Sequence, residues 1–314
     1  MSELPEPTHT LAHLRDWSFA GTALAVVGQP VGHSLSPPMH NAALAVLART
    51  HAQLAGWHYF KFDLAPGELA GALELFHARG FHGLNLTVPH KALVVPHLES
   101  RQDFVREAGA ANTLSRGATG WHGANTDGYG LSTALRADLA VELAGASVIL
   151  LGAGGAARAA ALECLQAGCA ALWIGNRTPS HLQGLLADLR RTTAFAGARS
   201  ARPGLRLEGF DPKGPLKDLP VGSVLINATS LGLKSADPAP IDLASLARPA
   251  HIFDMIYRPA QTALLRQAAA LGLPHANGLS MLLHQGARSL ELWTGLPAPV
   301  AVMQQAARAA LAAQ

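Results

Sequence analysis

Cysteine, aromatic residues and charged residues are all scarce in this chain, and each shortage excludes a class of protein. The only two cysteines, Cys164 and Cys169, cannot build a disulfide framework and favour a reducing cytoplasm; we interpret them as small core residues. Charged residues make up 14% of the 314, too few for a coiled coil or a solvated helical rod. No apolar run reaches the ~18 residues of a membrane span, and the first ten residues lack the pattern of a secretory signal. We therefore expect a soluble, cytoplasmic protein with no membrane partner.

Clusters of positive charge and of metal ligands are also missing. The net charge is +3, but the basic residues are scattered without a run of five, and aromatic residues are only 5%. Neither a phosphate-tracking patch nor a stacking platform is present, so we expect no nucleic-acid partner. The 15 histidines show no His-Glu-x-x-His or comparable spacing, so we expect no metal. We interpret His33 and His40 as support for the loop in which they lie.

Apolar residues, in contrast, are abundant at 49%, which excludes disorder, and the length suits two domains. Short β-rich runs alternate with longer Ala- and Leu-rich stretches, the pattern of α/β sheets. We expect strands at 24–27, 57–62, 82–86, 147–151, 171–174, 224–227, 252–255 and 274–276, with an extended piece at 111–113. Helices are expected at 36–49, 67–79, near 90–98, from about 128, after 152 and over 279–313, and a loop at 192–204.

A glycine-rich loop directly follows the strand expected at 147–151. Its sequence, Gly152-Ala153-Gly154-Gly155-Ala156-Ala157, fits the G-x-G-x-x-G/A pattern and precedes an Ala-rich helix. The first glycine of that pattern allows a tight turn, and the second lets the backbone approach a pyrophosphate. The helix N-terminus adds free N–H groups and a positive dipole end. A chance glycine cluster is disfavoured by the strand before it and the helix after it, so the loop predicts a dinucleotide site.

The residues after the next strand favour one nicotinamide cofactor over the other. A NAD site usually places Asp or Glu here, against the ribose 2′-hydroxyl. This chain has Gly175-Asn176-Arg177-Thr178 and no carboxylate. Arg177 can pair with a 2′-phosphate and stack on adenine, so we expect NADP in preference to NAD. The alternative is that Arg177 is an ordinary surface arginine in an Arg-rich chain.

Three polar clusters follow strands expected in the first part of the chain. The first, residues 28–41, contains Ser34 and Ser36, two hydroxyls that could both donate to one carboxylate near the start of a helix. Ser36 precedes Pro37, which also predicts that Ser36 is the N-cap of that helix. This cluster therefore predicts an anion site and, beside it, a structural role for Ser36.

The other two clusters place amides, hydroxyls and titratable groups after neighbouring strands. The second presents Asn85, Thr87 and Lys91, and the third presents Asn112 and Asp127. A lone lysine is ordinarily a solvated surface charge, so a functional role for Lys91 is supported only by the polar residues near it in the sequence. A lysine and an aspartate that converge on a substrate hydroxyl could exchange its proton while hydride leaves the same carbon.

Together these stretches resemble the shikimate dehydrogenases, a family that reduces 3-dehydroshikimate to shikimate with NADPH. The matching stretches occur in the family order and span about residues 24–295. They are GQPVGHSLSPPMHN at 28–41, GLNLTVPHK at 83–91, ANT at 111–113, NTDG at 125–128, GAGGA at 152–156, NRT at 176–178, NATSLG at 227–232, DMIY at 254–257 and NGLSMLLHQGA at 277–287.

The resemblance implies a role for each matching residue. Lys91 and Asp127 would be the catalytic pair. Shikimate or 3-dehydroshikimate would be bound at its carboxylate by Ser34 and Ser36 with Tyr257 nearby, and at its ring hydroxyls by Asn85, Thr87, Asn112 and Gln285. NADP would be bound by Gly152, Ala153, Gly154, Gly155, Ala156, Asn176, Arg177, Thr178, Met255 and Gly278.

The resemblance also implies an α/β fold of two domains. A discontinuous substrate-binding and catalytic domain would comprise residues 1–127 and 279–314, because the final helices of the family return to the first domain. Residues 128–278 would form a Rossmann-type NADP-binding domain. A homodimer is compatible with this organisation.

Two positions and the N-terminal segment depart from the family pattern. Asn277 stands where many members have Asp, and residues 1–20 extend beyond the usual start. His181 stands where a second phosphate-binding arginine is often found, so we expect a moderate preference for NADP.

Two alternatives stay open from the sequence. One is a quinate/shikimate dehydrogenase that uses NAD, and the other is a non-catalytic NADP-binding regulatory module. The two intact serines favour shikimate, and Arg177 favours NADP. The presence of both Lys91 and Asp127 disfavours the regulatory module, since function follows the site rather than the fold.

Overall fold

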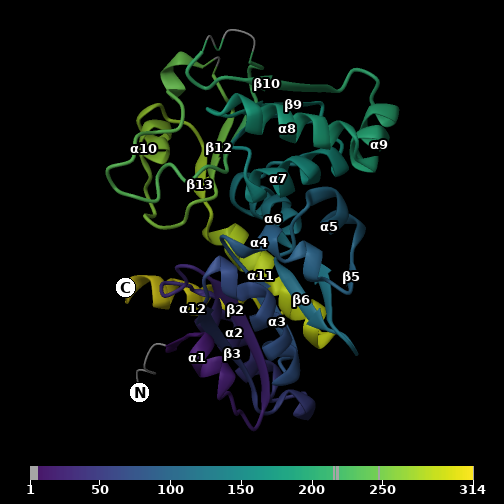
Figure 1. Cartoon of the computed structure of the whole chain (residues 1–314). Coiled ribbons are helices and arrows are strands. Elements are labelled where there is room, and N and C mark those ends of the chain that lie inside the picture. The colour runs from purple at the N-terminus through teal and green to yellow at the C-terminus, as the bar shows by residue number, and fades with distance from the viewer. Residues whose placement is uncertain (1–5, 215, 217–218, 247, 314) are drawn as a thin grey trace. The chain divides into compact units, whose positions relative to one another are not determined.

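The computed structural model describes residues 6–214, 216, 219–246 and 248–313. The chain divides into two compact units: unit 1 comprises residues 1–126 and 283–314, and unit 2 comprises residues 127–282 (Figure 1). Both units are built on a largely parallel sheet with helices on its faces. The predicted α/β class and the return of the C-terminal helices to the first domain are therefore confirmed.

Unit 1 contains a seven-stranded sheet in the order β1-β3-β2-β4-β6-β7-β5. Its strands are β1 (Thr8–His9), β2 (Thr22–Gly28), β3 (Trp57–Asp63), β4 (Gly83–Leu86), β5 (Ser100–Arg101), β6 (Thr113–Arg116) and β7 (Trp121–Ala124). Strands β1 to β4 are parallel, whereas β6 is antiparallel to both β4 and β7. Because parallel strands end at the same edge of a sheet, the polar segments after β2 and β4 lie at one edge.

The helices of unit 1 pack on this sheet and on one another. They are α1 (Leu11–Arg15), α2 (Ser36–Leu47), α3 (Leu69–Ala78), α4 (His90–Leu93), α5 (Asp103–Ala108), α12 (Val300–Ala312) and most of α11 (Leu279–Thr294), with short 3-10 turns at Ala52–Leu54, Pro66–Glu68 and Val95–His97. Helix α2 packs on β3, and α12 packs on α2. The aromatic core includes Phe62, Phe76 and Phe81, whose rings meet edge to face.

Unit 2 contains a six-stranded sheet in the order β10-β9-β8-β11-β12-β13, with every strand pair parallel. Its strands are β8 (Ser147–Leu151), β9 (Ala171–Gly175), β10 (Arg206–Phe210), β11 (Val224–Asn227), β12 (His251–Asp254) and β13 (His275–Asn277). Its helices are α6 (Asp127–Leu139), α7 (Gly155–Gln166), α8 (Pro179–Arg190), α9 (Thr193–Ala201) and α10 (Ala263–Ala270), with a 3-10 turn at Leu243–Ser245. The strand order reverses at β8, which is the position where doubly wound sheets bind their ligands.

Two sequence predictions about local structure are wrong. Residues 192–204, predicted as a loop, contain helix α9, because Thr192 caps it by accepting a hydrogen bond from Phe195 N at 3.1 Å and because it packs on α7. The helical stretch predicted over 279–313 is two helices, since Gly295, with φ of +70°, and two nearby prolines end α11 before α12 begins.

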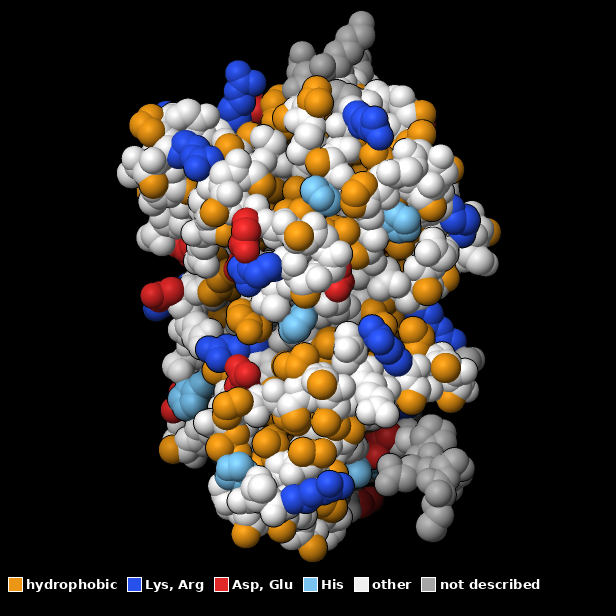
Figure 2. All heavy atoms as spheres, turned by 180° about the vertical axis from the view of Figure 1, so that it is seen from behind, with side chains coloured by type: hydrophobic (Ala, Val, Ile, Leu, Met, Phe, Trp, Pro, Cys, Tyr) orange, Lys and Arg blue, Asp and Glu red, His pale blue; other side chains and the backbone are white. Residues whose placement is uncertain are grey.

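Three further features concern the cysteines, the lengths of the helices and the surface charge. Both cysteines are free and buried, and burial raises the pKa of the Cys169 thiol to about 11. No helix in the described part of the chain has the length and apolarity needed to cross a membrane. On the face shown in Figure 2, Lys and Arg side chains are scattered singly rather than gathered into one basic patch.

Candidate active site

The segment that carries the two serines follows β2 and runs directly into α2. Ser36 is the first residue of α2, and its backbone N–H donates to Ser34 Oγ at 3.2 Å. The prediction that Ser36 is the N-cap is wrong, because Leu35 already has helical backbone angles and Ser34 supplies the capping oxygen. The Ser36 side chain, which is buried, is instead hydrogen-bonded to Tyr59 of β3.

A buried hydrogen-bond network joins four of the predicted site residues of unit 1. Tyr59 Oη donates to Asn85 Oδ1 at 2.8 Å, so Ser36 and Asn85 share one tyrosine. Asn85 Nδ2 donates to the Asn112 carbonyl at 3.0 Å. Asn112 Nδ2 donates in turn to Gln285 Oε1 at 3.1 Å. Residues 36, 85, 112 and 285, far apart in the sequence, therefore form one rigid polar cluster.

Three hydroxyl side chains complete this network, and none of them has a role predicted from the sequence. Thr113, Thr126 and Ser289 are buried and bonded to one another and to the two asparagines. Thr126 N also donates to Asn112 Oδ1 at 2.8 Å. Because buried polar groups must be paired, these hydroxyls hold the asparagine side chains in fixed orientations. Thr113 and Thr126 lie in the stretches that match the family, so those motifs could have indicated that the two threonines belong to the site.

Thr87 packs against the end of β2, and Lys91 lies beside the segment that leads to Asn112. A Cβ at Gly28 would lie 2.3 Å from Thr87 Cγ2, so the glycine at the end of β2 allows Thr87 to approach. The Lys91 carbonyl accepts a hydrogen bond from Ala111 N at 2.8 Å, which places helix α4 next to the segment that leads to Asn112. Both side chains are half-buried.

Unit 2 carries the remaining predicted residues, beginning with the glycine loop between β8 and α7. Gly152 has φ of +118°, and a Cβ there would lie 2.9 Å from the Ala228 carbonyl oxygen. In contrast, no heavy atom lies within 4 Å of the Cβ positions of Gly154 and Gly155. The loop therefore leaves open space at the N-terminus of α7, as a bound pyrophosphate requires, and its residues fit a dinucleotide.

The segment after β9 is exposed, as a cofactor-reading segment must be. Asn176 Nδ2 donates to the Thr178 carbonyl at 3.0 Å, which makes a tight local turn. Arg177, between them, is exposed, and His181 is exposed on α8. The segment offers a guanidinium and no carboxylate to a ligand, which fits a 2′-phosphate better than a 2′-hydroxyl.

A second buried network shapes the ends of β11 and β12. Asn227 Nδ2 donates to Asp254 Oδ1 at 2.9 Å, and Thr262 Oγ1 donates to Asp254 Oδ2 at 2.7 Å. Burial raises the pKa of the Asp254 carboxyl, and these hydrogen bonds oppose the rise. No role is predicted for these residues from the sequence, although two of them lie in the matching stretches. They set the backbone that leads to Met255 and Tyr257.

Met255 and Gly278, both predicted at the cofactor, are in contact. A Cβ at Gly278 would lie 2.0 Å from the Met255 carbonyl oxygen, so only glycine fits there. Gly278 N also donates to the Ile256 carbonyl at 3.2 Å.

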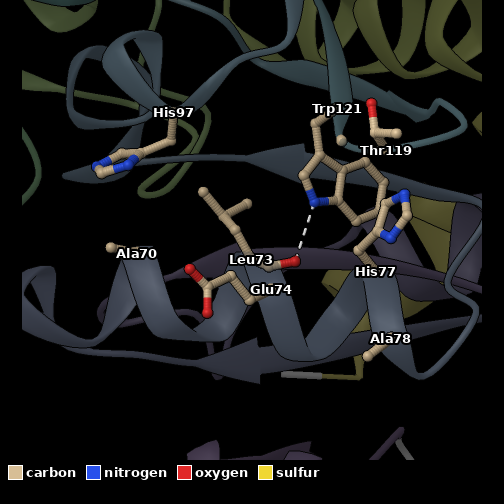
Figure 3. Close-up of a pocket in the computed structure, with 9 residues that line it drawn as sticks. Ala70, Leu73, Glu74, His77, Ala78, His97, Thr119 and Trp121 are labelled. Carbon is tan, nitrogen blue, oxygen red and sulfur yellow. Dashed lines mark hydrogen bonds between the residues drawn. The ribbon is translucent and has the colours of Figure 1, made fainter.

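Two other features of the structure lie outside this site. The cavity in Figure 3, of about 320 Å³, is lined by residues of α3, the region around residue 120 and His97, and it contains no predicted site residue. In this cavity the Trp121 indole donates to the Leu73 carbonyl at 3.0 Å, and this hydrogen bond joins β7 to α3 within unit 1. Among the described residues, no three His, Cys, Asp or Glu side chains are grouped so that they could hold a metal ion.

Comparisons with known proteins agree with this arrangement. The shikimate dehydrogenase substrate binding domain matches residues 26–114, and the shikimate 5′-dehydrogenase C-terminal domain matches residues 278–308. A shikimate dehydrogenase (NADP(+)) of Symbiobacterium thermophilum is 40% identical, over 94% of this chain and 96% of its own.

Solved structures of similar proteins extend over almost the same length. The shikimate 5-dehydrogenase of Thermus thermophilus, in complex with NADP(H) and shikimate, is 34% identical with a TM-score of 0.77, covering 92% of this chain and 99% of its own. A quinate dehydrogenase of Corynebacterium glutamicum in complex with NAD is 27% identical with a TM-score of 0.77, at 92% and 99% coverage. The chain belongs to the shikimate dehydrogenase family.

Proposed function

We propose that this chain is an NADP-dependent shikimate dehydrogenase, which interconverts 3-dehydroshikimate and shikimate with Lys91 and Asp127 as its catalytic pair. The observation that carries the proposal is the buried network that holds Ser36, Asn85 and Asn112 beside the segment of Lys91. The 40% identity to an NADP-dependent shikimate dehydrogenase over nearly the whole chain supports the same activity.

In this proposal, unit 1 binds the substrate. Ser34 and Ser36 donate to its carboxylate, and Thr87, Asn112 and Gln285 hold its ring hydroxyls. Both ends of the Asn85 side chain are bonded within unit 1. We therefore assign Asn85 the task of orienting Asn112, in place of the direct contact expected from the sequence. We also propose Tyr257, a residue of unit 2, as a further hydroxyl donor to the carboxylate.

Unit 2 binds the cofactor, which supplies a hydride to the substrate carbonyl carbon. The N–H groups of residues 153–156 would face the pyrophosphate, since that of Gly152 donates to the Gly175 carbonyl at 2.8 Å. Asn176, Arg177 and Thr178 would hold the adenosine 2′-phosphate. Met255 and Gly278 shape the nicotinamide end.

In this proposal, Lys91 and Asp127 stabilise the charge that develops on the reacting oxygen and transfer its proton. As the carbonyl oxygen becomes negative, the Lys91 ammonium stabilises that charge and donates the proton. Asp127 orients the substrate hydroxyl and the Lys91 ammonium. The reverse reaction runs through the same groups, with Lys91 as the base.

The activity is tested by steady-state assays with shikimate and quinate, each with NADP and NAD. We expect the highest kcat/KM for shikimate with NADP, since Arg177 favours the 2′-phosphate. Quinate carries an extra hydroxyl at the carboxylate-bearing carbon and needs more room beside Ser34 and Ser36. A higher kcat/KM for quinate with NAD would overturn the assignment, and turnover of neither substrate would favour the regulatory module.

The catalytic pair is tested by Lys91→Met, which keeps the aliphatic bulk and removes the charge and the proton. We expect kcat to fall at least ~10²-fold, the usual scale of general acid–base help, with a much smaller change in KM for shikimate. Asp127→Asn keeps the shape and loses the charge, so kcat should fall without unfolding. A folded Lys91→Met variant with nearly full kcat would show that the pair is a structural ion pair.

Two further proposals concern the assembled protein. We propose a cytoplasmic location, supported by two free, buried cysteines. We also propose a homodimer, which sedimentation equilibrium of the full chain would distinguish from a monomer.

A further inference from the structure

One face of strand β3 carries polar side chains where a buried strand usually carries apolar ones. Tyr59, Lys61 and Asp63 alternate with Phe60 and Phe62, which belong to the apolar core. Side chains at every second position of a strand share one face, so the three polar groups point the same way. Lys61 is only 7% exposed, which is rare for a lysine and calls for a partner.

The partners of Lys61 and Asp63 lie in the turn that carries Ser34. Lys61 Nζ donates to the Gly32 carbonyl oxygen at 2.7 Å. Asp63 Oδ2 accepts a hydrogen bond from Val31 N at 3.2 Å. The same turn is closed by Ser34 N, which donates to the Val31 carbonyl at 3.0 Å. Two opposite charges of one strand therefore hold neighbouring peptide groups of a four-residue turn.

Lys61 contacts the turn two residues before Ser34, and both side chains also face one cavity. Lys61 and Ser34 line one cavity of about 860 Å³, whose walls are otherwise mainly the alanines and prolines of α2 and α12. The hydrogen bond to the Gly32 carbonyl occupies one of the three ammonium protons of Lys61. Glu6, the acidic residue that lines this cavity, is paired with His58 at 2.9 Å. Burial lowers the pKa of Lys61, and the charge of Glu6 opposes that change.

We propose that Lys61 is a positioning residue that makes the serine turn selective for a carboxylate. Through Gly32 it fixes the direction of the Ser34 hydroxyl, and its positive charge favours an anionic group over a neutral one at that hydroxyl. Asp63 holds the other side of the turn. The inference rests on the proposed function and deepens it, because it names a residue outside the matching motifs that selects for the substrate's carboxylate.

The test compares shikimate with its carboxamide, which has the same shape and no charge. For Lys61→Met we expect the KM for shikimate to rise about ten-fold or more, with kcat changed less than about three-fold. The KM for the carboxamide should change less than about three-fold, and the KM for NADP should not change. Lys213→Met, at an exposed lysine of unit 2, is the matched control and should leave all four values unchanged.

Two further measurements separate this role from a merely structural one. Lys61→Met removes the donor to the Gly32 carbonyl and should therefore lower the melting temperature modestly, whereas the KM for NADP should stay that of the wild type. Lys61→Arg keeps the charge and should recover part of the preference for the carboxylate. Equal losses for shikimate and the carboxamide, or an unchanged KM for shikimate, would overturn the inference.

Calorimetric binding of shikimate keeps this inference distinct from the proposed function. If the wild-type protein binds shikimate but does not turn it over, the proposed function fails, and weaker binding by Lys61→Met still supports the role of Lys61. If the wild type and Lys61→Met bind shikimate equally, the inference fails and the proposed function stands. A wild-type protein that binds no shikimate would overturn both.

Discussion

Arg177 is exposed immediately after β9, and within the described residues no hydrogen bond or ion pair holds its side chain. An exposed guanidinium without a structural partner is available to a ligand. Charge-assisted hydrogen bonds to a phosphate are typically worth about 1.5–3 kcal/mol, and about 1.4 kcal/mol is ten-fold in affinity. We therefore expect Arg177→Ala to raise the KM for NADPH ten-fold or more and to change the KM for NADH little.

Steady-state kinetics with both cofactors check this prediction. Equal losses with NADPH and NADH would mean that Arg177 only stacks on adenine or supports the loop. His181 stands near the start of α8, where the family often has a second arginine, so the wild-type preference for NADP should be moderate.

At the scale of the element, the turn between β8 and α7 depends on Gly152. Its φ of +118° disfavours any other residue, and a Cβ would press on the backbone of Ala228 at the end of β11. We expect Gly152→Ala to lower the free energy of unfolding by about 1–3 kcal/mol, the usual cost of such strain. It should also weaken NADP binding more than shikimate binding, because the loop belongs to unit 2.

Denaturant unfolding and calorimetric titration measure the two effects. Gly184→Ala is the matched control: it lies inside α8, no heavy atom lies within 4 Å of its Cβ position, and alanine favours a helix by about 0.5–1 kcal/mol. A Gly152→Ala variant as stable as the wild type, with the same affinity for NADP, would contradict this account of the loop.

At the scale of the whole molecule, His40 links the two chain segments that form unit 1. Its ring lies 4.2 Å from that of Tyr59 in β3 and 5.8 Å from that of Trp293 in α11. The side chain is fully buried, neither ring nitrogen has a hydrogen-bond partner among the residues that the structure describes, and burial lowers the pKa of His40 to about 3. His40 is therefore a neutral packing residue in the folded protein.

This burial makes stability depend on pH. In the unfolded chain His40 takes up a proton near pH 6.5, whereas in the folded protein it does so only near pH 3. The unfolded state binds more protons in between, so the free energy of unfolding falls as the pH drops through this range. Between pH 7 and pH 5 the loss from this one group is about 2 kcal/mol.

We expect His40→Leu, which is similar in volume and does not titrate, to lose less stability than the wild type over that interval. Urea unfolding at pH 7 and pH 5 measures it, followed by tryptophan fluorescence, because four of the five tryptophans lie in unit 1. His9 and His90 also have lowered pKa values, and they contribute equally to the pH dependence of the wild type and of His40→Leu. The difference between the two proteins therefore reports on His40 alone. Identical slopes for the two proteins would show that His40 does not resist protonation.

The sequence by itself determined the features that depend on neighbours along the chain. The strands around 24–27 and 147–151, the glycine loop after the second of them and the segment around Arg177 could all be predicted, because their signals are local runs and spacings. The short strands β5 and β10 and the helix α9 could not, since Arg-, Gly- and Ala-rich segments carry little periodicity and these elements form by packing on others.

The tertiary structure alone decided which distant groups meet. Asn85 donates to Ser289, which is 204 residues away, and Lys61 donates to Gly32, which is 29 residues away. A hydrogen bond is set by direction and distance in space, and no spacing along the chain encodes either. The sequence thus pointed to the residues that we propose to face the ligands, whereas the residues that support them, such as Tyr59, Lys61 and Ser289, became visible only when the strands and helices were packed together.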